Sequence, residues 1–111
     1  MVTDPWHGLA VYRSQDAENW RHQGVILGAA SKRQDDGPRG HHADVLVLGD
    51  EAYIFYHTHP GAKGIQQGPD LEYGRRRSSL HCARLELTDG KVCCLREGLE
   101  LALDHEMAAA F

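Results

Sequence analysis

The sequence predicts an all-β fold of short antiparallel strands. Short runs of apolar and β-branched residues alternate with stretches rich in Gly, Asp, Ser and Pro, as in small β domains. The Asp-Gly pair at 89–90 is typical of a tight hairpin turn. Before the C-terminal tail, no segment of useful length repeats its apolar residues with the period of a helix. The expected strands are residues 8–13, 23–28, 43–48, 52–57, 78–87, 92–95 and 98–103.

The first two expected strands flank a polar turn. Residues 8–13 and 23–28 are mostly apolar, whereas residues 14–20 are polar apart from Trp20 at their end. We expect Trp20 to fold back onto the sheet and join the core. Residues 29–40 then form a polar loop, and loops of about a dozen residues are commonly functional or mobile.

The next two strands carry the most informative residues. Residues 43–48 are almost continuously apolar, which predicts a strand buried on both faces. Alternation along residues 52–57 and the residue that follows places Ile54, Tyr56 and Thr58 on one face, with Tyr53, Phe55 and His57 on the other. Pairing these strands through a turn at residues 49–51 brings their far ends together. Those ends carry four of the eight histidines and one carboxylate: His41, His42, His57, His59 and Asp44.

The last strands follow a second long polar loop at residues 61–77. Residues 78–87 and 92–95 should pair through the turn at residues 88–91, and residues 98–103 alternate well enough for a final strand. The tail at 104–111 has helix formers but only marginal length for a stable helix.

Composition bounds the class of protein. A chain of 111 residues with 41% hydrophobic and 25% charged residues fits one globular domain. The net charge of −4 disfavours a nucleic-acid partner, and no apolar run approaches the roughly 20 residues of a membrane span. The N-terminus lacks the pattern of a secretory signal, and three cysteines, two of them adjacent, fit reduced thiols. We therefore expect a cytoplasmic protein whose cysteines are small buried apolar residues.

The order of these segments resembles the five-bladed β-propeller glycoside hydrolases of family 43. The resemblance rests on Gly8-Leu-Ala-Val-Tyr-Arg-Ser, Asp16, Asn19-Trp20 and Gly24-Val-Ile-Leu, then Gly40-His-His-Ala-Asp-Val-Leu-Val and Ala52-Tyr-Ile-Phe-Tyr-His. It implies one partial β-propeller domain over residues 1–111. Residues 1–28 would end one blade, residues 41–103 would form the last blade, and residues 104–111 would be a tail. Five blades need about twenty strands, so the chain would supply the last one to two blades of such a protein.

The resemblance implies hydrolysis of glycosidic bonds in plant or microbial oligosaccharides by paired carboxylic acids. Asp44 and His42 would be the catalytic candidates, although Asp44 equally fits a carboxylate that accepts backbone hydrogen bonds at a strand start. His42 would position a carboxylate, a water or a structural ion, and no other cofactor is expected. The substrate-binding candidates are His57, His41, Trp6 and His7, with Trp6 either a platform for a sugar face or ordinary packing.

Two other functions compete with this interpretation. The segment Tyr56-His-Thr-His-Pro is similar to the zinc motif of JAMM-type metalloproteases, in which His57, His59 and Asp70 would hold the metal. Gln67 stands where that motif has a serine. The other alternative is a non-catalytic carbohydrate-binding or assembly module that associates with itself or a partner through exposed sheet edges.

Overall fold

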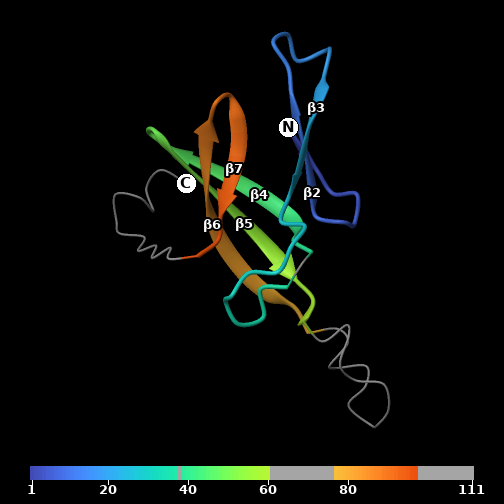
Figure 1. The fold of residues 1–111 in the computed structure, drawn as a ribbon, viewed down its shortest axis with the longest axis vertical. Coiled ribbons are helices and arrows are strands. Elements are labelled where there is room, and N and C mark those ends of the chain that lie inside the picture. The colour runs from blue at the N-terminus through green and yellow to red at the C-terminus, as the bar shows by residue number, and fades with distance from the viewer. Residues whose placement is uncertain (38, 61–76, 98–111) are drawn as a thin grey trace.

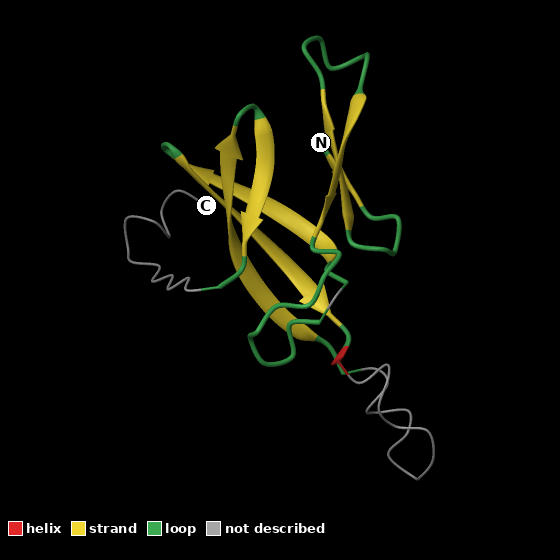
Figure 2. Cartoon of the chain, viewed as in Figure 1, coloured by secondary structure: helices red, strands yellow, loops and turns green. Residues whose placement is uncertain are grey.

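The computed structural model of the chain describes residues 1–37, 39–60 and 77–97. These residues form two antiparallel sheets and no α-helix, which confirms the predicted all-β class (Figures 1 and 2). None of them forms a helix long and apolar enough to cross a membrane. The predicted strand at 98–103, the tail at 104–111, Asp70 and nearly all of the second loop lie outside the described residues.

The first sheet has three strands in the order β1-β2-β3. Its strands are β1 (Val2–Thr3), β2 (Leu9–Arg13) and β3 (Arg21–Ile26), of which the two-residue β1 was not predicted. A register shift between Val11 and Tyr12 marks a β-bulge opposite β3. The tip of the β2–β3 hairpin projects beyond the second sheet (Figure 1).

The second sheet is an up-and-down meander in the order β4-β5-β6-β7. Its strands are β4 (His41–Leu48), β5 (Glu51–Thr58), β6 (Ser79–Thr88) and β7 (Lys91–Leu95). Both predicted hairpins are present. Asp89 and Gly90 have positive φ values of 51° and 73°, as a two-residue type I′ turn requires, and Gly49 opens the other turn at a φ of 59°.

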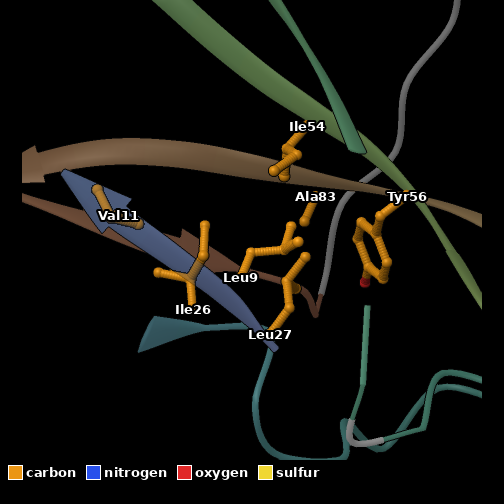
Figure 3. Close-up of a cluster of buried hydrophobic side chains, with 7 residues drawn as sticks. All are labelled: Leu9, Val11, Ile26, Leu27, Ile54, Tyr56 and Ala83. Atoms are coloured by element: carbon orange, nitrogen blue, oxygen red, sulfur yellow. The ribbon is translucent and has the colours of Figure 1, made fainter. Parts of the chain in front are cut away.

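The core lies between the two sheets. The first sheet contributes Leu9, Val11 and Ile26, together with Leu27, which directly follows β3. These side chains pack on Ile54, Tyr56 and Ala83 of the second sheet (Figure 3). Ile54, Tyr56 and Thr58 are all buried on the inner face, as the alternation along β5 predicted. The small size of this cluster fits the modest core that a chain of this length can bury.

The interior of β4 is not buried on both faces, contrary to the prediction. Val45 and Val47 lie opposite Ile54 and Ala52 and so share the inner face, yet their side chains are 40% and 66% exposed. β4 is an edge strand of its sheet, and the first sheet does not cover this part of the inner face. A continuous apolar run therefore marks an edge strand here.

Trp20 is not a core residue, which is a second correction. Its side chain is 40% exposed at the end of the β2–β3 turn. The Asp16 carboxylate accepts hydrogen bonds from the Glu18 and Asn19 amides at 2.9 and 2.8 Å, which closes the turn on itself. This hairpin tip extends beyond the second sheet (Figure 1), and Trp20 is left exposed among the residues that the structure describes.

The three cysteines are free thiols and only partly buried. Cys94 packs against the core cluster, and burial raises the pKa of its thiol to about 11. This residue alone fits the expected small apolar role closely.

Candidate functional site

Histidine and tryptophan rings gather where the β1–β2 connection meets the start of β4 and the end of β5. His41 is the pairing partner of His57, which confirms that the two strand ends meet. The His41 ring centroid lies 5.5 Å from that of His59 and 6.3 Å from that of His42. Trp6 adds its ring from the β1–β2 connection, 4.7 Å from the His41 ring.

Asp4 holds this connection in place. Its carboxylate accepts hydrogen bonds from the Trp6 amide at 2.9 Å and the His42 amide at 3.2 Å. Each of its oxygens also lies 3.2 Å from Nδ1 of His41. Asp-Pro favours a turn, and the sharp path of the chain is completed by positive φ at Trp6 and Gly8. Asp4 thus joins the β1–β2 connection to the first residues of β4.

These contacts shift the pKa of Asp4. Partial burial alone would raise it, but the amides of Trp6 and His42 and the ring of His41 outweigh burial and lower it. The carboxylate is therefore held in its charged form beside a nearly buried imidazole, whose side chain is 6% exposed.

Trp6 presents an open ring at this site. It is 57% exposed, although it contacts His41 and meets the His42 ring edge-on at a centroid distance of 5.7 Å. An indole that is fixed on one side and open on the other can stack on the apolar face of a small ring-shaped ligand. Trp6 is therefore not a core residue, and its open ring is compatible with the platform expected for a sugar face.

The remaining histidines differ in environment. Burial, followed by the nearby rings of His41, His42 and His57, lowers the pKa of His59. Nδ1 of His57 is buried and has no hydrogen-bond partner among the described residues. His42 is exposed and lies at a β-bulge with a φ of 49°, so its ring departs from the regular alternation of β4.

Asp44 and His7 lie apart from this cluster. Asp44 is exposed, and its carboxylate accepts a hydrogen bond from the neighbouring Val45 amide at 2.9 Å, which is the structural role weighed for it above. His7 lines a groove of about 990 Å³ between β3 and β7 instead of the ring cluster. The structure therefore brings together Trp6, His41, His42, His57 and His59, but not these two candidates.

A metal role gains no support from the arrangement of the described residues. They contain no group of three or more His, Cys, Asp or Glu side chains placed to hold a metal ion. This applies both to the structural ion considered near His42 and to a centre at His57 and His59, whose third candidate ligand, Asp70, is not described.

A second polar cluster was missed by the sequence analysis. Asp36, within the loop at 29–40, is 2% exposed, and its carboxylate lies 2.8 Å from Arg33 and 2.5 Å from Arg96. The Tyr56 hydroxyl donates to the same carboxylate at 2.9 Å, and Ser31 donates at 2.7 Å. The two guanidinium groups also bind backbone oxygens of Cys82, Ala29, Asp36 and Gly37. This cluster fastens the loop to the second sheet.

The pKa values of Asp36 and Tyr56 reflect the many hydrogen bonds in this cluster. Burial opposes the charged form of Asp36, but hydrogen bonds from Arg96, Ser31, Arg33 and Tyr56 outweigh it and hold its pKa well below the usual range. Burial and the hydrogen bond to Asp36 raise the pKa of Tyr56 to about 12. The signal in the sequence was Tyr56 itself, because a tyrosine predicted on the buried face needs a partner for its hydroxyl.

Comparison with known proteins adds no family. No protein-family model and no curated protein matches the chain.

Proposed function

We propose that this chain binds carbohydrate, as part of a family 43-like glycoside hydrolase, through the surface formed by Trp6 and His42, with the buried His41 ring beneath them. The observation that carries the proposal is the Trp6 ring, which is 57% exposed and fixed by Asp4 and two imidazole rings. A sugar ring offers an apolar face to an indole, while its hydroxyls bind polar side chains around the rim.

The fold is compatible with this assignment. A four-stranded up-and-down antiparallel sheet is the unit from which β-propellers are built. The first sheet packs on it through the core cluster, as a neighbouring blade would. The motifs that resemble family 43 enzymes span both sheets.

Hydrolysis would belong to a complete propeller. It requires two carboxyl groups on opposite sides of the scissile bond, about 5 to 9.5 Å apart. Asp4 is committed to Trp6, His41 and His42, and the Asp44 carboxylate binds the Val45 amide. The described residues therefore favour recognition by this chain, with Asp44 and His42 as its contribution to catalysis when further blades are present.

The two tryptophans allow a matched test. Both are exposed, Trp6 at 57% and Trp20 at 40%, but only Trp6 lies among the histidines. Titrating the chain with a panel of oligosaccharides should change tryptophan fluorescence in the wild type and in Trp20→Phe. Trp6→Ala should abolish binding, whereas Trp20→Ala should keep it.

Binding that survives Trp6→Ala, or no response to any sugar of the panel, would overturn the proposal. Hydrolysis of an aryl glycoside by the pure chain, if lost in Asp44→Asn, would extend the function from binding to catalysis.

A further inference from the structure

The outer edge of β4 differs from the edges of β7 and β1. The edge of β7 is covered by Gln23, whose side chain accepts from the Val92 amide at 2.9 Å and donates to the Val92 carbonyl at 3.1 Å. β1 is an edge of only two residues. β4 has eight residues and, among the described parts of the chain, no strand on its outer side.

Two carboxylates cover part of that edge. Asp4 binds the His42 amide at the start of β4, and Asp44 binds the Val45 amide further along. The second bond places the Val45 N–H on the outer side of β4. Because backbone groups of an antiparallel strand alternate between its two sides, the Val47 N–H points outward as well.

The side chains along this edge are also available. Val45 and Val47 are 40% and 66% exposed, and Asp44 is the only charged residue of β4 apart from any protonated histidine. A long apolar edge strand with few charges is the kind that pairs with another strand. The uncovered part of β4 therefore offers both backbone hydrogen bonds and apolar surface.

We propose that β4 pairs antiparallel with β4 of a second copy of this chain, giving a closed dimer with one continuous eight-stranded sheet. The two-fold axis passes near Leu46, so that Val45 of each copy lies opposite Val47 of the other and exchanges backbone hydrogen bonds with it. An isologous contact of this kind uses up both edges and stops at two copies. The inference does not depend on carbohydrate binding.

The charge of Asp44 and the bound amide of His42 favour this register of two identical strands. In this register Asp44 lies opposite Leu48 of the second copy, so the one acidic group on each β4 meets no like charge. Centring the pair on Val47 would place Asp44 opposite Asp50, whereas centring it on Val45 would bring His42 into the pairing, opposite Leu48. The register centred on Leu46 also leaves out His42, whose amide is already bound by Asp4.

Asp44 then acts as a competitor for pairing. Its carboxylate occupies the Val45 amide in the single chain, and that amide must be released to the Val47 carbonyl of the second copy. Asp44→Ala should tighten the dimer by about fivefold to tenfold for each of the two copies, the equivalent of one net hydrogen bond per copy.

Sedimentation equilibrium from micromolar to millimolar chain concentration tests the proposal. The wild type should approach twice the 12.4 kDa mass of the chain. Val47→Pro removes the outward N–H while sparing the ladder with β5, and should remain monomeric. Val47→Thr keeps that N–H and loses only apolar contact, so it should still dimerise.

Hydrogen exchange provides a readout that does not depend on the proline variant folding. In the wild type, the Val45 and Val47 amides should gain protection as concentration rises, while the inner Ile54 amide should not change. A wild type that stays monomeric at millimolar concentration, an open-ended series of larger oligomers, or a folded Val47→Pro chain that dimerises like the wild type would overturn the proposal.

Discussion

Asp36 and Asp4 show two ways in which this chain uses a carboxylate to hold a loop on a sheet. Asp36 has no exposed side-chain surface and is surrounded by two guanidinium groups, a phenol and a serine hydroxyl. Asp4 is 21% exposed and binds two backbone amides and one imidazole. The Asp36 cluster is closed to solvent at its centre, whereas the Asp4 site borders the open ring of Trp6.

This difference suggests that the Asp36 cluster serves folding stability and the Asp4 site serves ligand recognition. A buried carboxylate with every hydrogen-bonding position filled has no capacity left for a ligand, but its loss leaves two cations without their partner. A site at the surface contributes less to folding and leaves rings and polar atoms for binding. We therefore expect substitutions at Asp36 to act on the free energy of unfolding, and substitutions around Asp4 to act mainly on ligand binding and pH response.

The largest effect should come from Asp36→Asn. The neutral side chain keeps the size of aspartate but cannot balance Arg33 and Arg96, so we expect a loss of about 3–5 kcal/mol in the free energy of unfolding. Urea denaturation followed by circular dichroism measures it.

Asp35→Asn is the matched control. Asp35 is the adjacent residue and binds Arg77 at 3.0 Å, but both side chains are partly exposed, so the loss should stay within about 1 kcal/mol. If both variants lost the same free energy of unfolding, the buried Asp36 cluster would contribute no more to stability than the partly exposed ion pair of Asp35.

Gly40 lies between the loop that carries Asp36 and the start of β4 at His41. A substitution there should give the next largest loss of stability. A Cβ at this position would lie 2.8 Å from Cδ1 of Leu27 and 2.9 Å from the Tyr56 ring, both of them in the core. Gly40→Ala should therefore cost about 1–3 kcal/mol of stability through overpacking. A thermal melt would show it as a lower midpoint.

Gly24→Ala is the control for this variant. A Cβ at Gly24, in β3, meets no atom within 4 Å, so the substitution should be neutral or slightly stabilising. If Gly40→Ala melted like Gly24→Ala, the link between the Asp36 loop and the ring cluster would be loose instead of close-packed.

The sequence predicted local structure well and long-range polar contacts poorly. The Asp-Gly turn follows from residues within the β6–β7 hairpin, and the facing of Ile54 and Tyr56 and the meeting of His41 with His57 follow from spacing within the β4–β5 hairpin. Asp36 and Arg96 are 60 residues apart, and no periodic pattern relates a loop residue to the end of a distant strand. Their contact depends on how the two sheets pack.

The prediction that the apolar run of β4 and Trp20 are buried was wrong for a related reason. The run in β4 and the aromatic character of Trp20 predicted burial, but each lies where one sheet extends past the other. Hydrophobicity indicates which residues could be covered, whereas the relative placement of the sheets decides which are. Residues 43–48 were expected to be buried on both faces, and the exposure of Val45 and Val47 in β4 is what suggests pairing with a second copy.

The smallest effect should be a pH dependence that separates the two regions. The pKa of His59 is lowered by burial and by the surrounding imidazoles, so the unfolded chain binds more protons than the folded one below the reference value of 6.5. Stability contributed by neutral His59 is therefore lost as pH falls from 6.5 through its lowered pKa. The carboxylates Asp4 and Asp36, with pKa values below 3.8, weaken only at more acidic pH.

Trp6 should report the first of these changes before the fold is lost. In Trp20→Phe, the fluorescence of the single remaining tryptophan should begin to change as the pH falls below 6.5, while circular dichroism of the sheets stays constant until the carboxylates titrate. His59→Gln should abolish the early phase, because the ring that resists protonation is gone. A single transition shared by both signals would mean that the ring cluster and the Asp36 cluster unfold as one unit.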